Sequence, residues 1–174
     1  PDILVCAKGL TSGYIPLGAT LISDEIYEVI SRPQCEDGVF SMGLTYFGHP
    51  VACAAALKNI EIIEKDNLLQ NARDAGSYFQ DAAKDLLSLP HVGDVRGHGL
   101  MLAIDLVADK ASKAPLPPSA KAGATVFEKC LERGVVVRPV GDRIILSPPL
   151  IISGSEVDTI FAAVSGSIAE FVTS

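Results

Sequence analysis

One lysine in this chain stands where an amine could do covalent chemistry. Lys8 follows the apolar run Ile3–Ala7 and precedes a loop that contains Ser12-Gly13 and Pro16. The run predicts a strand buried on both faces. A lysine at its end either reaches solvent at the sheet edge or works as a neutral amine with a lowered pKa, and lysines of the second kind form Schiff bases. From the residues alone, an ordinary surface lysine stays open as the alternative.

A second candidate lies before Pro50, a residue that suits the first turn of a helix. Gly43, Thr45 and Gly48 offer a hydroxyl and unobstructed backbone N–H groups beside the positive end of that helix. These features predict an anion site, and the alternative for Thr45 is an ordinary loop or capping threonine. His49 fits a structural position at the helix start, so no catalytic role is predicted for it.

The third candidate is Arg138, which stands between a run of valines and a proline, near a turn. A guanidinium in that setting is costly unless it reaches solvent or an anion, and a carboxylate can accept two parallel N–H bonds from it. The alternative is a surface salt bridge.

The segments around Lys8 resemble a known signature. Cys6-Ala7-Lys8-Gly9-Leu10, then Gly13, then Pro16-Leu17-Gly18-Ala19, are similar to the cofactor-lysine motif of the class III aminotransferases, which use pyridoxal 5'-phosphate (PLP). The resemblance implies that Lys8 holds PLP as a Schiff base. It also implies that Lys8 is the acid and base that moves a proton between the amino donor and the cofactor.

The resemblance extends to the other two candidates. Thr45 matches the threonine of a T-x-x-G-H-P-like element, which in the family contacts the cofactor phosphate of the partner subunit. This implies a homodimer with shared active sites. Arg138 matches the mobile arginine of the omega-amino acid and amine:pyruvate subgroup, which binds the substrate carboxylate and swings aside for an amine.

The resemblance covers essentially all 174 residues and implies an α/β fold, the fold type I of PLP-dependent transferases. It places the end of the large doubly wound domain at residues 1–65, a connecting helix at 66–90 and a C-terminal α+β small domain at 91–174. The chain is therefore expected to be the C-terminal portion of the enzyme. The N-terminal half of the same protein would be its partner and would supply the aspartate that pairs with the pyridine nitrogen of the cofactor.

The resemblance also favours one branch of the family. Ornithine- and 4-aminobutyrate-type members usually carry an arginine three residues before the first proline of a PPL-like element, and that position is Ile145 here. The expected substrates are therefore a small amine or omega-amino acid and an oxo acid, with pyruvate favoured. Two alternatives remain: another class III PLP enzyme, such as an aminomutase or decarboxylase, or a catalytically silent fragment that only folds and dimerises.

Composition excludes several other classes. The net charge of -7 argues against nucleic acid and anionic membranes as partners. No apolar run approaches the roughly 18 residues of a membrane span, and no secretory signal is visible, so a cytoplasmic protein is expected. The hydrophobic content of 48% favours a large buried interface in addition to a core. The histidines and cysteines have no metal-ligand spacing, so no metal site is expected.

Local patterns predict the remaining elements. A helical pattern runs from Pro50 to about Leu89, with Asp66-Asn67 as the best place for a break. Further predicted elements are a strand within His91–Val107 with Arg96–Gly99 as its bulge or entry, a helix at Ser119–Arg133, a hairpin turn at Val140–Arg143, and a last helix that begins with a capping box at Ser155–Asp158.

Overall fold

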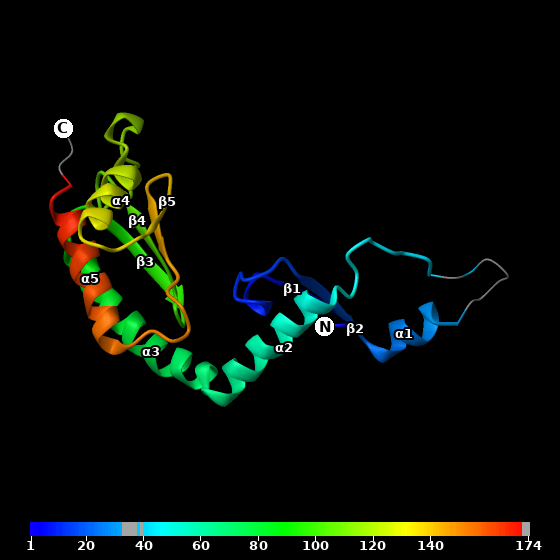
Figure 1. The fold of residues 1–174 in the computed structure, drawn as a ribbon. Helices are drawn as coiled ribbons and strands as arrows, with labels where there is room; N and C mark the ends of the chain where they lie inside the picture. The colour runs from blue at the N-terminus through cyan, green and yellow to red at the C-terminus, as the bar shows by residue number, and fades with distance from the viewer. Residues whose placement is uncertain (33–37, 39, 172–174) are drawn as a thin grey trace. The chain divides into compact units, whose positions relative to one another are not determined.

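The chain divides into two compact units at the predicted break, Pro1–Asp66 and Asn67–Ser174. The computed structural model describes residues 1–32, 38 and 40–171. Helix α2 (Pro50–Lys65) ends just before the break and helix α3 (Leu68–Ala83) begins just after it, with Asn67 in the left-handed conformation between them (φ 51°) (Figure 1). The helix that was predicted to connect two domains is packed within the second unit.

The first unit contains a hairpin and two helices. Strands β1 (Ile3–Ala7) and β2 (Gly18–Ile22) pair antiparallel, with Val5 opposite Thr20. Helix α1 (Asp24–Ile30) follows, and its N-cap is Ser23, whose hydroxyl accepts a hydrogen bond from the Ile26 N–H.

The prediction that β1 is buried on both faces is wrong for this chain. The side chain of Val5 is 74% exposed, and Ile3 and Leu4 are exposed as well. The sheet in this unit has only two strands among the described residues, and no layer there covers its faces enough to bury them. The apolar run therefore forms the predicted strand, but that strand is not buried as expected.

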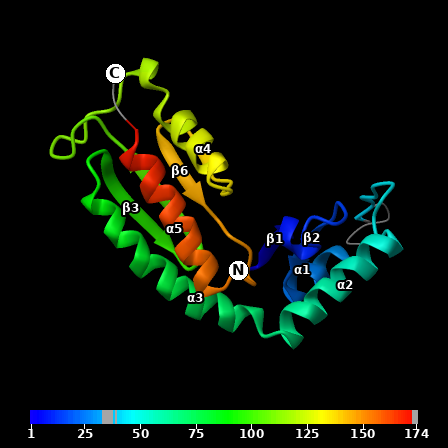
Figure 2. The same cartoon turned by 60° about the vertical axis from the view of Figure 1, so that its left-hand side comes forward.

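The second unit is built on an antiparallel sheet with the order β3-β4-β6-β5. Its elements, in chain order, are α3, a 3-10 segment at Lys84–Ser88, β3 (Val92–His98), β4 (Met101–Leu106), a 3-10 turn at Pro118–Ala120, α4 (Ala122–Glu132), β5 (Arg138–Val140), β6 (Arg143–Leu146) and α5 (Gly154–Ala169). The helices α3, α4 and α5 lie on one face of this sheet (Figure 2).

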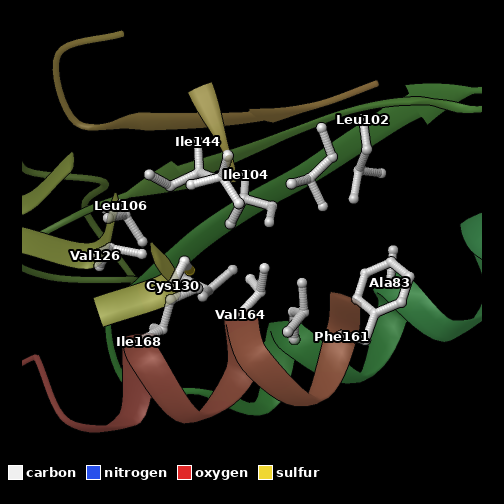
Figure 3. Close-up of a cluster of buried hydrophobic side chains, with 14 of the residues drawn as sticks. Ala83, Leu102, Ile104, Leu106, Val126, Cys130, Ile144, Phe161, Val164 and Ile168 are labelled. Carbon is white, nitrogen blue, oxygen red and sulfur yellow. The ribbon is translucent and has the colours of Figure 1, made fainter. Parts of the chain in front are cut away.

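The core of the second unit fills the space between the sheet and the helices (Figure 3). Ile104 and Ile144 point into it from the sheet, and Val164 and Ile168 point into it from α5. The rings of Phe79 and Phe161 meet at a centroid distance of 5.0 Å and an interplanar angle of 50°, a tilted arrangement that aromatic pairs favour. Full burial of a side chain of this size stabilises the fold by roughly 1.5–3 kcal/mol. The side chains that α5 buries include Val157, Phe161, Val164 and Ile168.

Three local predictions need correction. The stretch predicted as one strand forms two, β3 and β4, because the chain reverses at Gly99 (φ 55°). The bulge lies earlier, between Val92 and Asp94. The helix predicted from Ser119 begins at Ala122, because Lys121 has a left-handed conformation (φ 44°) that ends a preceding 3-10 turn.

The capping box of α5 uses Ser153 and Glu156 instead of Ser155 and Asp158. The Ser153 hydroxyl accepts a hydrogen bond from the Glu156 N–H, and the Glu156 carboxylate accepts one from the Ser153 N–H. Both serine positions have an acidic residue three places later, so spacing alone does not choose between them. The predicted hairpin turn is confirmed, with β5 and β6 antiparallel around it.

None of the helices within the described residues is long and apolar enough to cross a membrane.

Candidate active site

Lys8 ends strand β1 in a strained conformation. Its φ is 54°, in the left-handed region that costs an ordinary residue roughly 1–2 kcal/mol. It begins a 3-10 turn, Lys8–Leu10, in which the Thr11 N–H donates to the Lys8 carbonyl at 3.2 Å. The Lys8 side chain is exposed, and no polar group in the described residues bonds its Nζ.

An asparagine from α2 holds the turn that follows Lys8. Asn59 Nδ2 donates to the carbonyl oxygens of Gly9 (2.9 Å) and Leu10 (3.2 Å), and Asn59 Oδ1 accepts from Ser12 Oγ (2.6 Å). At the other end of the loop, the buried Thr11 donates from Oγ1 to the Ile15 carbonyl at 2.7 Å. Asn59 is not among the residues predicted from the sequence. The available signal was a poor helix former amid alanine, leucine and isoleucine.

The second predicted site is a turn at the start of α2. Thr45 is exposed in the turn 45–48, where the Phe47 N–H donates to the Leu44 carbonyl at 3.0 Å and Gly48 has a φ of 63°. His49 occupies the N-cap position, but its side chain makes no capping hydrogen bond. The first N–H groups of a helix have no partner within the helix. The start of α2 therefore combines an uncapped positive end with a nearby hydroxyl, which is the chemistry of an anion site.

The structure brings the lysine loop and the threonine turn to one cavity. This cavity has a volume of about 350 Å³, and Ile15, Pro16 and Leu17 line it from the lysine loop while Tyr46 and His49 line it from the turn. His49 Nδ1 is buried there without a hydrogen-bond partner among the described residues. The first two motifs are therefore neighbours in the first unit, although they lie far apart in sequence.

Arg138 belongs to the second unit, where it begins strand β5. It pairs directly across the sheet with Ile145, the other position that the resemblance uses to assign the subgroup. Both residues line a cavity of about 520 Å³ whose other walls come from residues 134–137, 146–149, 151–152 and the first turns of α5. The guanidinium is exposed, and it is the only arginine side chain in the described residues without a hydrogen bond or ion pair.

The neighbours of Arg138 on the sheet explain why it alone is free. Residues directly opposite in antiparallel strands share a face, so the open face of the sheet carries two rows across four strands. One row is Arg96, Ala103, Ile145 and Arg138, and the other is Asp94, Asp105, Arg143 and Val140. Each arginine of this face except Arg138 has an aspartate beside it.

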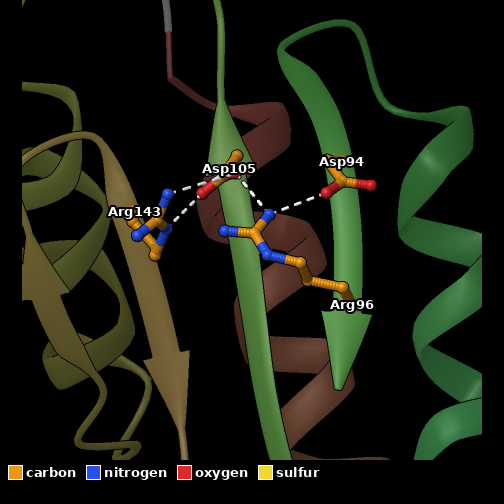
Figure 4. A network of polar contacts seen from close by, with 4 residues as sticks. All are labelled: Asp94, Arg96, Asp105 and Arg143. Atoms are coloured by element: carbon orange, nitrogen blue, oxygen red, sulfur yellow. Dashed lines mark hydrogen bonds and ion pairs between the residues drawn. The ribbon is translucent and has the colours of Figure 1, made fainter.

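Asp105 lies at the centre of the resulting ion network (Figure 4). It accepts hydrogen bonds from Arg143 and from Arg96, and Arg96 also donates to Asp94 at 2.7 Å. Partial burial raises the pKa of Asp105, but the hydrogen bonds and positive charges of Arg143 and Arg96 outweigh it and leave the pKa below the ordinary value. Hydrogen bonds to Asp105 and Asp94 raise the pKa of Arg96. The network pairs two of the three arginines of this face and leaves Arg138 without a partner among the described residues.

Comparison with known proteins gives the family. The family model described as Aminotransferase class-III matches residues 1–168. The chain is 47% identical, over 157 residues, to adenosylmethionine-8-amino-7-oxononanoate aminotransferase of Methanocaldococcus jannaschii, covering 90% of this chain and 34% of that protein. It is 39% identical, over 158 residues, to the chloroplastic gamma aminobutyrate transaminase 3 of Solanum lycopersicum, covering 91% and 30%.

Solved structures agree with the sequence comparison. The amine transaminase of an uncultivated Pseudomonas species, in its PLP-bound form, superposes with a TM-score of 0.93 at 42% identity, covering 99% of this chain and 39% of that one. The α/β fold class predicted above, that of the fold type I PLP-dependent transferases, is confirmed. The chain belongs to the class III aminotransferase family, whose matched members here are transaminases. It spans about a third of the length of its curated relatives, 34% and 30% in the two cases given.

Proposed function

We propose that this chain is part of an aminotransferase that binds PLP covalently through Lys8 and transfers an amino group from an amine or omega-amino acid to an oxo acid, with pyruvate as the acceptor. The observation that carries the proposal is Lys8 itself, a free amine held in a left-handed conformation at a strand end, inside the family motif. Strained backbone at such a place is typical of functional residues.

The residues of the first unit fit PLP. Lys8 offers an amine with no competing hydrogen-bond partner in the described part of the chain. The uncapped start of α2 and the exposed hydroxyl of Thr45 offer donors for a phosphate. By the family resemblance, that phosphate belongs to the cofactor of a partner subunit, so we propose a homodimer with shared active sites. We also propose that the N-terminal half of the same protein completes the site, because the relatives are about three times longer.

Each of these residues has a proposed task in the reaction. When bound, PLP withdraws electrons from the amine-bearing carbon of the donor and so makes its proton acidic. The amine of the donor would replace Lys8 on the cofactor, and the released Lys8 Nζ would then be the base that removes this proton and the acid that returns it. Arg138 grips the carboxylate of the acceptor through two parallel N–H bonds, and it is available because Asp105 and Asp94 occupy the other arginines of that face. Thr45 helps hold the phosphate.

The test is a spectrum of the full-length protein with added PLP, before and after borohydride, followed by peptide mass mapping. A visible band that borohydride fixes as a pyridoxyl group on Lys8 supports the cofactor and its residue. Failure of the full-length protein to form this adduct would disprove the proposal. The same measurement on the isolated chain tests whether this chain is a catalytically silent fragment, which would form no adduct.

A second assay tests the reaction and the acceptor. The full-length enzyme is supplied with one amine and either pyruvate or 2-oxoglutarate, and the aminated product is measured. Amino transfer to pyruvate separates an aminotransferase from an aminomutase or decarboxylase, neither of which consumes an oxo-acid acceptor. A clear preference for 2-oxoglutarate would contradict the subgroup inferred from Arg138 and Ile145.

A further inference from the structure

We propose that Asn59 is the positioning residue for Lys8: its side-chain amide fixes the turn that aims the lysine. This role depends on the proposed function of Lys8. Asn59 would be the residue through which α2 sets the direction of the Lys8 side chain.

The contacts of Asn59 all go to one short turn. Its Nδ2 donates to the Gly9 and Leu10 carbonyls at 2.9 and 3.2 Å, and its Oδ1 accepts from Ser12 Oγ at 2.6 Å. In the described residues, no other side chain outside the loop hydrogen-bonds the segment from Lys8 to Ser12. The single side chain of Asn59 therefore hydrogen-bonds the two carbonyls that follow Lys8, those of Gly9 and Leu10, and the hydroxyl of Ser12 at the end of the turn.

The turn needs such a restraint because its backbone is strained. Lys8 and Ser12 have φ values of 54° and 50°, which ordinary residues adopt only when their surroundings impose them. The hydrogen bonds within the turn are long, 3.2 Å from Thr11 N to the Lys8 carbonyl and 3.3 Å from Ser12 N to the Gly9 carbonyl. If the Gly9 carbonyl were released, the Gly9–Leu10 peptide could rotate, and the turn that sets the direction of the Lys8 side chain would loosen.

The chemistry of the turn calls for an amide. Two carbonyls need two N–H donors and the Ser12 hydroxyl needs an acceptor, and a short side-chain amide supplies both kinds of group. The helix itself gains nothing from this residue, because asparagine is a poorer helix former than alanine. Asn59→Ala should therefore leave α2 intact and loosen the turn.

The experiment uses the full-length protein, with PLP as the probe. The variants are Asn59→Ala, which removes all three bonds, and Asn59→Asp, which keeps the acceptor but puts oxygen where the donor was. The control is Lys58→Ala, which removes the exposed Lys58–Glu61 pair of the same helix and none of the bonds to the turn.

Two quantities are measured for each protein. The first is amide hydrogen exchange of residues 9–14 without PLP, which reports the turn directly. The second is the rate at which Lys8 becomes fixed to PLP by borohydride, followed as a function of pH. We expect both Asn59 variants to exchange about ten times faster and to be trapped about ten times more slowly than wild type, and we expect Lys58→Ala to match wild type in both.

The outcomes separate this inference from the proposed function. If the wild type gives no adduct at Lys8, the proposed function fails and the positioning role fails with it. If the wild type gives the adduct and the Asn59 variants are trapped at the same rate and with the same pH profile, Asn59 is merely structural and only this inference is overturned. If Asn59→Ala does not fold, Asn59→Asp decides by the same criterion.

Discussion

The two units hold their candidate site residues by different forces. In the first unit the described buried side chains are Thr11, Ala52 and Ala56, and the turn after Lys8 is fixed by directional hydrogen bonds from Asn59. In the second unit a large apolar core fixes the sheet, and Arg138 extends from that sheet on the opposite face. Substitutions of polar residues should therefore change the geometry of the first site, whereas the second site should change only when its core or its charge pattern changes.

The largest effect should come from removing the amine. Lys8→Ala in the full-length enzyme should lower the rate of amino transfer by at least about 10³-fold, because both the covalent link and the acid–base group are lost. Replacing a left-handed, exposed residue should leave the thermal unfolding midpoint within a few degrees of wild type. Steady-state kinetics and a melting curve check this, and an active variant would remove Lys8 from the mechanism.

The core of the second unit can be broken at Phe79, which has 0% exposure and contacts Phe161. Phe79→Ala should lower the free energy of unfolding by about 3–5 kcal/mol, through lost burial and the cavity that remains. Denaturant unfolding measures the change, with Leu131→Ala, at an exposed position, as the control expected within about 0.5 kcal/mol of wild type. Equal effects of the two variants would contradict the placement of the core.

Substituting Arg138 should alter the site without altering the fold. Arg138→Met keeps the aliphatic part of the exposed side chain and removes the charge, so stability should change little. The kcat/KM for pyruvate should fall about 30-fold, in line with the loss of about 2 kcal/mol of charged hydrogen bonding. The kcat/KM for a donor amine without a carboxylate serves as the internal control. A parallel fall for both substrates would argue against carboxylate binding by Arg138.

The smallest effect concerns the charge pattern around Asp105, whose pKa lies below the ordinary value. A carboxylate with a lowered pKa in the folded state stabilises it above the unfolded pKa of about 3.9, and this contribution disappears as the pH falls through the folded value. Asp105→Asn should therefore cost about 1 kcal/mol at pH 7. The difference from wild type should shrink below about pH 4, as unfolding curves at several pH values would show. A difference independent of pH would exclude an electrostatic origin.

Local signals in the sequence predicted the parts of the fold that depend on neighbouring residues. Pro50 marked the start of α2, Asp66-Asn67 marked its end, and Val140–Arg143 marked the hairpin. The Asn59 contacts could not be predicted in this way, because they join residues 47 to 50 positions apart. Hydrogen bonds between distant segments leave no periodic pattern in the sequence.

Burial was the second quantity that the sequence could not supply. The apolar run of β1 predicts a strand correctly, but exposure depends on which layers cover that strand. In the second unit Leu102, Ile104 and Leu106 of β4 are buried, because α3, α4 and α5 cover that face of the sheet. The three candidate residues were found by their chemistry and by family resemblance, and their proposed roles await the experiments above.

If Arg138 binds the acceptor carboxylate as proposed, its direct pairing with Ile145 would link acceptor choice to the stability of the sheet. An arginine at position 145 would face Arg138 with their Cβ atoms about 5 Å apart, and like charges at that separation repel. An acceptor with two carboxylates could neutralise both guanidinium groups, whereas pyruvate has only one carboxylate. Ile145→Arg would thus produce a protein whose second unit melts at a lower temperature without ligand and regains that difference on binding a dicarboxylate. Any redesign of this site toward such acceptors should therefore change positions 138 and 145 together.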